Sequence, residues 1–141
     1  KGWWIDTGKK DPLLECNRQV LRTISGEIQE SVEISKDSSV DQQVRIGNNS
    51  RIIDSRLRGP VVIGNNVTII NANIGPFTSI GDGCTIENSL IENSVLMKGC
   101  SITNSQYLTD SLIGNFCRVT GPQSSKPCSL MIGDDSVLDI P

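Results

Sequence analysis

A short phrase recurs along most of this chain: an aliphatic residue, usually followed by glycine, precedes two turn-forming residues. The starts of the phrases are separated by 17, 17, 16, 17 and 19 residues. The copies are Ile46-Gly47-Asn48-Asn49, Ile63-Gly64-Asn65-Asn66, Ile80-Gly81-Asp82-Gly83, Leu96-Met97-Lys98-Gly99, Ile113-Gly114-Asn115-Phe116 and Ile132-Gly133-Asp134-Asp135. So many copies in register are improbable by chance, and the repeat constrains the fold more than any other feature of the sequence.

Each period also holds further aliphatic positions, so that apolar residues recur five or six residues apart. These positions are Ile52 and Leu57, Ile69 and Ile74, Ile86 and Ile91, Ile102 and Leu108, and Val119. The spacing fits neither an amphipathic helix nor an alternating strand. It does fit short strands joined by tight turns, three to a coil, each pointing one aliphatic side chain into a narrow prism. Asn, Asp and Gly tolerate the positive φ of such turns, and the sequence predicts an all-β parallel β-helix of the hexapeptide type.

Composition and charge limit the possible partners. Aromatic residues make up only 4% of the 141 residues, so the core must be aliphatic. The formal net charge of -3, without long charged runs, offers no basic footprint for nucleic acid or an anionic membrane. No stretch approaches the roughly 18 apolar residues of a membrane span, and the amino terminus lacks a signal-peptide pattern. We therefore expect a soluble, cytoplasmic protein with no nucleic-acid or membrane partner.

The five cysteines fit neither a disulfide framework nor a zinc site, because no CxxC pair occurs and the chain has no histidine. The fifth position of each phrase is occupied by Ser50, Val67, Cys84, Cys100, Cys117 and Ser136. Neighbouring coils lie about 4.8 Å apart. Cys84, Cys100 and Cys117 could therefore form a metal ladder or a disulfide. We expect instead a buried column of small residues.

The ends of a solenoid expose unpaired backbone and need a cap. Asp11-Pro12 predicts the start of a helix and Gly26 its end, with a helix over roughly residues 11–25. Its apolar face would consist of Leu13, Leu14, Val20, Leu21 and Ile24. We expect this helix to cap the amino-terminal end of the solenoid. At the other end, residues 121–127 interrupt the repeat, and residues 129–140 are expected to return as a last coil.

Arginines cluster in one part of the sequence, at Arg45, Arg51, Arg56 and Arg58. They suggest a phosphate-binding edge. However, Arg45 and Arg51 are six residues apart and therefore fall on successive sides of the prism, which point in different directions. We expect an exposed charged rim that is balanced by Asp41 and Asp54.

Three stretches carry a resemblance to a known family. They are Gly2-Trp3-Trp4-Ile5-Asp6-Thr7-Gly8-Lys9 with the following segment Leu13 to Arg18, the coil Gly59-Pro60-Val61-Val62-Ile63-Gly64, and Ile74-Gly75-Pro76-Phe77-Thr78-Ser79-Ile80-Gly81. Over almost its whole length the chain resembles the carboxy-terminal part of the sugar-phosphate nucleotidyltransferases, most closely the long form of glucose-1-phosphate thymidylyltransferase. The first stretch is fairly specific to this family, whereas hexapeptide repeats occur in proteins with many unrelated activities. The resemblance implies a single-stranded left-handed β-helix, an exception to the right-handed crossover rule.

The resemblance also implies where the chemistry of that family is located. There, a nucleotide-binding domain with a glycine-rich phosphate loop precedes the β-helix, and these 141 residues contain no such domain. We expect residues 1–10 to be the end of that domain, residues 11–26 the capping helix and residues 27–141 the β-helix domain.

By the same resemblance, Asp6 in Trp4-x-Asp6-Thr7-Gly8 matches an aspartate that helps to hold the catalytic Mg²⁺ beside a second carboxylate. One carboxylate cannot hold Mg²⁺ usefully, because the site needs substrate phosphates and another fixed oxygen ligand. In this chain we expect a solvated Asp6, no catalytic residue and no cofactor, with Mg²⁺ belonging to the parent enzyme. Without the nucleotide-binding domain, Trp3 and Trp4 either pack against an oligomer surface or lie exposed.

Several functions are compatible with such a fold. Hexapeptide acyltransferases generally use a histidine as general base, and the absence of histidine makes this hypothesis the weakest. The chain is then either the non-catalytic assembly and regulatory module of a sugar-1-phosphate nucleotidyltransferase or a free-standing β-helix that binds a partner or a small molecule. Flat prism faces can pack about a symmetry axis, and analogy with other β-helices favours a homotrimer.

Overall fold

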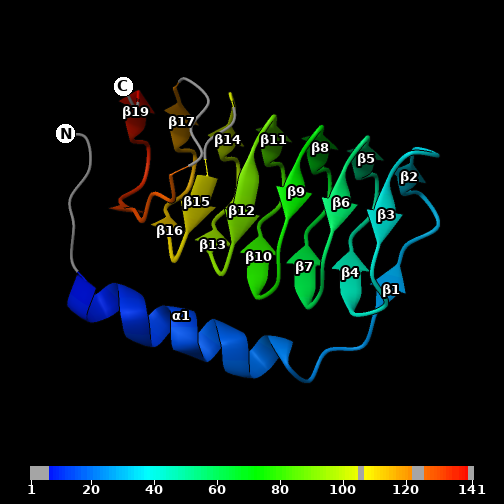
Figure 1. Cartoon of the computed structure of the whole chain (residues 1–141), viewed down its shortest axis with the longest axis horizontal. Coiled ribbons are helices and arrows are strands. Elements are labelled where there is room, and N and C mark those ends of the chain that lie inside the picture. The colour runs from blue at the N-terminus through cyan, green and yellow to red at the C-terminus, as the bar shows by residue number, and fades with distance from the viewer. Residues whose placement is uncertain (1–6, 105–106, 122–125, 140–141) are drawn as a thin grey trace.

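Strands of two or three residues account for most of the structure. The computed structural model describes residues 7–104, 107–121 and 126–139. Within these ranges, helix α1 (Thr7–Leu21) is followed by 19 strands, β1 to β19, which wind into one solenoid (Figure 1). Neighbouring strands pair in parallel throughout. The predicted parallel β-helix with an amino-terminal helix is therefore confirmed.

The strands form three sheets, one for each side of a prism. Sheet A contains β1 (Glu27–Ile28), β4 (Val44–Ile46), β7 (Val61–Ile63), β10 (Thr78–Ile80), β13 (Val95–Leu96), β16 (Leu112–Ile113) and β18 (Met131–Ile132). Sheet B contains β2 (Glu33–Ile34), β5 (Arg51–Ile53), β8 (Thr68–Ile70), β11 (Thr85–Glu87), β14 (Ser101–Ile102), β17 (Arg118–Thr120) and β19 (Val137–Asp139). Sheet C contains β3 (Ser39–Val40), β6 (Arg56–Leu57), β9 (Asn73–Ile74), β12 (Leu90–Glu92) and β15 (Tyr107–Thr109).

The pairing register follows the sequence repeat. In sheet A, Ile80 pairs with Ile63 on one side and with Leu96 on the other, even though the latter interval is one residue shorter. Equivalent columns are Ile52, Ile69, Ile86, Ile102 and Val119 in sheet B, and Leu57, Ile74, Ile91 and Leu108 in sheet C. These side chains are at most 2% exposed. The aliphatic positions singled out by the spacing therefore form the core.

Side-chain hydrogen bonds join most turns of the sheet A corner to the next coil. The backbone N–H of Asn48 donates to Asn65 Oδ1 at 2.8 Å, and the N–H of Asn65 donates to Asp82 Oδ1 at 2.8 Å. In the same way, the N–H of Lys98 donates to Asn115 Oδ1, and the N–H of Asn115 donates to Asp134 Oδ1. A Cβ atom on Gly64 would lie 2.2 Å from Asp82 Oδ1. The glycine of the phrase therefore leaves room for the acceptor that the next coil supplies.

The fourth residue of every phrase has a positive φ, as the turn residues predict. These residues are Asn49, Asn66, Gly83, Gly99, Phe116 and Asp135. Phenylalanine is unusual in this left-handed region, which bulky side chains disfavour. The Phe116 ring lies over Gly99, where an added Cβ atom would come within 2.3 Å of it.

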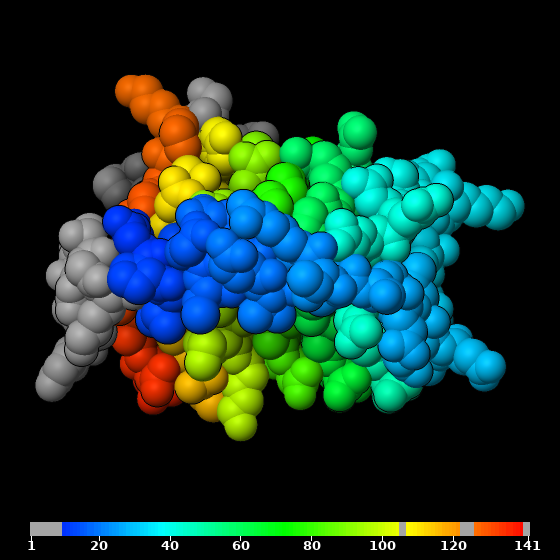
Figure 2. All heavy atoms as spheres, turned by 90° about the horizontal axis from the view of Figure 1, so that it is seen from below, coloured from blue at the N-terminus to red at the C-terminus, as the bar shows by residue number. Residues whose placement is uncertain are grey.

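The position of helix α1 differs from the prediction. The helix begins at Thr7 and contains Pro12, so Asp11-Pro12 does not start it. It lies along the outer face of sheet A, opposite in direction to the advance of the coils, and does not cover the amino-terminal end of the solenoid (Figures 1 and 2). Lys10 bonds Ser129 in the last coil, Asn17 bonds Ser79, and the Gln43 side chain bonds the chain just after the helix.

An apolar column on the outside of sheet A explains this position. The outward residues there include Val62, Val95, Leu112 and Met131. Leu14 and Leu21, seven residues apart on the helix, are 3% and 1% exposed. Leu13 and Val20, which we placed on the same face, instead remain exposed. No helix of the described residues is long and apolar enough to cross a membrane.

The amino-terminal coil is consequently left open at its end. Ile28 and Ile34 are 46% and 38% exposed, although they are in register with the buried Ile46 and Ile52. The neighbouring residues Glu27 and Glu33 place charge on this edge, which discourages pairing with another sheet. At the other end, β18 and β19 confirm the predicted last coil.

The core register predicts the effect of a single buried charge. Ile80→Asp places a carboxylate without a partner inside the aliphatic prism, where an unpaired charge is strongly destabilising. We expect loss of the cooperative thermal transition monitored by circular dichroism. Arg51→Glu is the control, because the Arg51–Glu33 ion pair is exposed and worth at most about 1 kcal/mol. Arg56→Glu is likewise expected to leave the fold intact. A soluble Ile80→Asp protein with a cooperative transition would contradict the register.

The turn ladder predicts coupling between Gly64 and Asp82. Gly64→Ala should destabilise the chain by roughly 1–3 kcal/mol, because its Cβ atom displaces the Asp82 carboxylate. In an Asp82→Ala background the clash with the carboxylate is absent, and the cost of Gly64→Ala should fall. Urea unfolding of the two single variants and the double variant measures the coupling. Additive effects would show that the glycine is not placed for this acceptor.

Candidate functional site

The metal ligand implied by the resemblance, Asp6, lies outside the described residues, as do Trp3 and Trp4. Among the residues that the structure does describe, no group of three or more acidic, cysteine or histidine side chains is arranged to hold a metal ion. Mg²⁺ requires an octahedral set of oxygen ligands. The described residues therefore do not form its site, and the assignment of Asp6 stays a prediction.

The arginine cluster separates onto different sides of the prism. Arg45 is on sheet A and donates to the Ser25 carbonyl at 3.1 Å, whereas Arg51 is on sheet B and pairs with Glu33 at 3.0 Å. Arg58 follows β6 and pairs with Glu92 at 2.6 Å. A shared phosphate-binding edge is therefore not formed.

The carboxylate partners of the arginines also differ from those expected. The two ion pairs use Glu33 and Glu92 in place of Asp41 and Asp54. Asp41 accepts the backbone N–H of Gly59 at 3.1 Å, so its carboxylate fixes a turn. The Glu92 carboxylate also accepts the Tyr107 hydroxyl at 3.3 Å, and its negative charge raises the pKa of that tyrosine.

The predicted column of small residues is present and fully buried. Its members Ser50, Val67, Cys84, Cys100, Cys117 and Ser136 are at most 1% exposed. The Ser50 hydroxyl donates to the Gly64 carbonyl of the next coil at 2.9 Å, and the Cys100 thiol donates to the corresponding Gly114 carbonyl at 3.0 Å. Because serine and cysteine make the same bond, the column is a structural ladder.

The thiols of this column are poorly suited to chemistry. All five cysteines of the chain are free thiols. The hydrogen bond with Cys84 and burial both raise the pKa of Cys100, and burial also raises the pKa values of Cys117 and Cys128. The hydrogen bond with Cys100 lowers the pKa of Cys84 in turn. The thiolate is the reactive form of cysteine, but Cys84, Cys100 and Cys117 are fully buried and therefore inaccessible to a substrate.

An apolar groove lies between helix α1 and sheet A. It has a volume of about 510 Å³, and helix residues Leu13, Cys16, Asn17 and Val20 line one side. The opposite side consists of Val95, Met97, Leu112, Gly114, Met131, Ile132, Gly133 and Asp134 from the last coils. Leu13, Val20 and Met97 are 50%, 61% and 43% exposed. An exposed apolar groove of this kind is typical of a protein contact.

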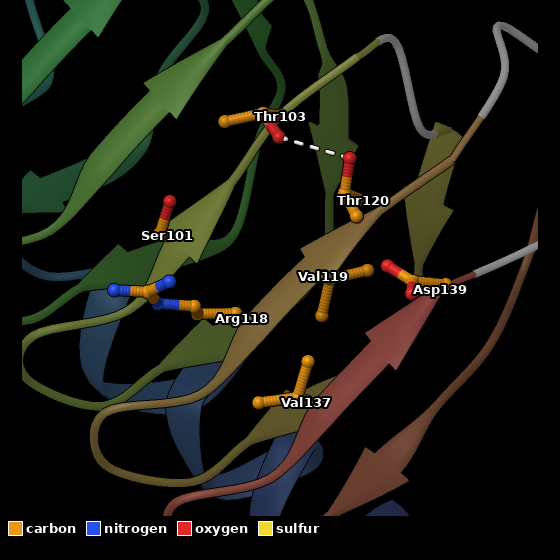
Figure 3. A pocket seen from close by; sticks show the side chains of 7 residues that line it. All are labelled: Ser101, Thr103, Arg118, Val119, Thr120, Val137 and Asp139. Atoms are coloured by element: carbon orange, nitrogen blue, oxygen red, sulfur yellow. Dashed lines mark hydrogen bonds between the residues drawn. The ribbon is translucent and has the colours of Figure 1, made fainter.

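A second, polar hollow lies on the outer face of sheet B near the end of the solenoid. It has a volume of about 330 Å³ and is lined by Ser101, Thr103, Arg118, Val119, Thr120, Val137 and Asp139. The side chains come from β14 and the turn after it, β17 and β19 (Figure 3). Thr103 Oγ1 donates to Thr120 Oγ1 at 3.2 Å. A cation, a carboxylate and several hydroxyls are thus brought together from separate coils.

The spacing of the repeat did not reveal these two surfaces. It identifies the inward residues, whereas both surfaces consist largely of outward residues and helix residues. A signal for the hollow was present, because residues flanking an inward position point outward. Arg118 and Thr120 flank Val119, and Val137 and Asp139 flank Leu138.

Comparison with known proteins identifies the class. Residues 57–137, more than half of the chain, match the family described as the GMPPB C-terminal domain. The chain therefore belongs to the GMPPB C-terminal domain family. Its fold is the left-handed parallel β-helix of the hexapeptide type. The resemblance to the sugar-phosphate nucleotidyltransferases is confirmed.

Individual relatives agree with this family. The chain is 35% identical over 144 residues to a glucose-1-phosphate thymidylyltransferase of Streptomyces antibioticus, a match covering 99% of this chain and 39% of that enzyme. It is 35% identical over 136 residues to the enzyme of the same name from Streptomyces griseus, covering 96% and 38%. The chain thus spans less than two fifths of the length of these curated relatives.

A solved structure, that of a proposed acetyltransferase from Bacillus cereus, shares the fold. Its TM-score is 0.60 at 15% sequence identity, over 82% of this chain and 73% of that chain. At this identity the similarity concerns the fold alone.

Thiol accessibility tests the ladder. In the native chain at pH 8 we expect Ellman's reagent to modify one thiol rapidly, because Cys16 is exposed on α1. The buried Cys84, Cys100 and Cys117 should react only after unfolding. Cys16→Ser is the matched control and should remove the rapid phase. Rapid modification of two or more further thiols would contradict the buried ladder.

Proposed function

We propose that this chain is the assembly module of a sugar-1-phosphate nucleotidyltransferase, which makes a nucleotide sugar from a nucleoside triphosphate and a sugar 1-phosphate. The main support is the alignment of nearly the whole chain with two glucose-1-phosphate thymidylyltransferases, of which it covers 39% and 38%. In such an enzyme the remaining length would carry the nucleotide-binding domain. Asp6 would then act at the junction as one of the Mg²⁺ ligands, together with substrate phosphates.

The side chains of the β-helix support a role without catalysis. The chain has no histidine, the residue whose pKa is best matched to general base catalysis near neutral pH. Its stacked thiols are buried and bonded to backbone carbonyls. Two of its arginines, Arg51 and Arg58, are engaged by carboxylates of other coils. The outward residues are therefore better suited to contacts than to bond-making chemistry.

The groove beside α1 supports assembly with a second copy of the chain. Leu13 and Val20 on the helix and Met97 on the prism leave apolar surface exposed in one place. Asp134 is the one charged residue among those that line the groove, so recognition by a highly charged partner is disfavoured. The arrangement proposed is a homotrimer, formed in the cytoplasm.

Sedimentation equilibrium of the chain and two valine variants tests this assembly. Val20→Glu places a charge in the groove and should convert the oligomer into monomers, with a shift in apparent dissociation constant of at least tenfold. Val137→Glu is the matched control, because Val137 is equally exposed, at 64% against 61%, but lies on sheet B outside the groove. It should leave the oligomer unchanged.

Circular dichroism of both variants confirms that they are folded, since each change is made at an exposed position. A monomeric wild-type chain, or a Val20→Glu oligomer as stable as the wild type, would overturn the assignment of the groove to assembly. The family membership does not depend on this outcome.

A further inference from the structure

We propose that the polar hollow on sheet B is a binding site for a small phosphorylated sugar. The site lies on the outer face of the solenoid, among residues that the resemblance does not associate with catalysis. This inference does not depend on the proposed function. It rests on the arrangement of β14, β17 and β19 and on the hydrogen-bonding capacity that their outward side chains leave unused.

The parallel register arranges the polar groups in two columns. Ser101 and Arg118 are paired residues on neighbouring strands, and so are Thr120 and Asp139. Neighbouring strands are about 4.8 Å apart, and residues two apart on one strand are separated by roughly 6.6 Å. The guanidinium of Arg118 and the carboxylate of Asp139 therefore lie at opposite sides of the hollow, as Figure 3 shows.

The charged groups of the hollow are not engaged by other described residues. Arg51 and Arg58 each form an ion pair within the β-helix. Arg118 and Asp139, in contrast, form no ion pair or side-chain hydrogen bond with any residue that the structure describes. The Ser101 hydroxyl is also free of an intramolecular partner among these residues. Their hydrogen-bonding capacity is available to a ligand.

The two sides of the hollow fit different parts of one ligand. Arg118 supplies the planar donor group that suits a phosphate, and the Ser101 hydroxyl can donate to another phosphate oxygen. The Asp139 carboxylate is an acceptor for sugar hydroxyls, with Thr103 and Thr120 beside it. Val137 offers apolar surface to the C–H groups of a sugar ring.

The same chemistry disfavours simpler ligands. Inorganic phosphate would engage Arg118 but leave Asp139 and the threonines without a partner, and an uncharged sugar would leave Arg118 without a partner. A polyanion such as nucleic acid would be repelled by Asp139. The volume of about 330 Å³ is of the size reported for small-molecule pockets. A compact ligand with one anionic end and several hydroxyls uses all of these groups.

Isothermal titration of the chain with glucose 6-phosphate, glucose and inorganic phosphate tests the site. We expect saturable binding of glucose 6-phosphate, with at least tenfold weaker binding of glucose and of phosphate. Arg118→Gln should weaken binding of glucose 6-phosphate at least tenfold. The matched control is Arg56→Gln, which removes an exposed arginine from sheet C, outside the hollow, and should leave the affinity unchanged.

Asp139→Asn separates the two parts of the proposal. It should weaken binding of glucose 6-phosphate but leave any weak binding of inorganic phosphate unchanged or improved, because a repulsive charge is removed. Circular dichroism of each variant verifies the fold. Absence of binding up to about 10 mM, which corresponds to a binding free energy weaker than roughly 2.7 kcal/mol, would overturn the proposal. So would equal binding of inorganic phosphate, or an Arg118→Gln chain that binds like the wild type.

Discussion

The structure depends on the stacking of one coil directly upon the next. Every strand pairs in parallel with its counterpart in the neighbouring coil, so that inward side chains stand in columns. The prism is narrow, and each side contributes little more than one inward residue per strand. A coil therefore cannot change its register on one side without moving the residues of the other two sides out of the core. This coupling explains why the aliphatic positions recur so regularly in the sequence.

The same constraint gives the repeated phrase its chemical meaning. The isoleucine fills the core, and the glycine leaves space for a side-chain oxygen from the next coil. The side chain of Asn65 accepts the N–H of Asn48, and the N–H of Asn65 donates to Asp82. Asn115 acts in the same way between Lys98 and Asp134. Turn propensity alone explains why such residues are frequent, but not why they alternate with glycine. The hydrogen-bonded ladder explains both.

Much of the fold could be predicted from the sequence because the core has a period. The columns through Ile80 and Ile86, the buried position of Cys100 and the return of the last coil follow directly from spacing. The placement of α1 could not, since Leu13, Leu14, Val20 and Leu21 make either side of the helix a plausible contact. The choice is made by the apolar outer column of sheet A, which only the three-dimensional register assembles. The groove and the hollow were missed for a related reason: the repeat identifies inward residues, whereas both surfaces consist largely of outward residues and helix residues.

Function is then expected on the outside of the prism, where stacking leaves the residues free to vary. Helix α1 covers part of one face and leaves an apolar groove, while sheet B presents a polar hollow near the last coil. We propose both as contact surfaces of a domain that spans less than two fifths of the length of its relatives. The central claim is that the chain works as part of a larger nucleotidyltransferase. The most direct measurement is the intact mass of the native gene product, together with the coding sequence that precedes Lys1. We predict a product much heavier than 15.3 kDa with an in-frame, glycine-rich nucleotide-binding domain upstream. A start codon at this boundary and a native product of 15.3 kDa would contradict it.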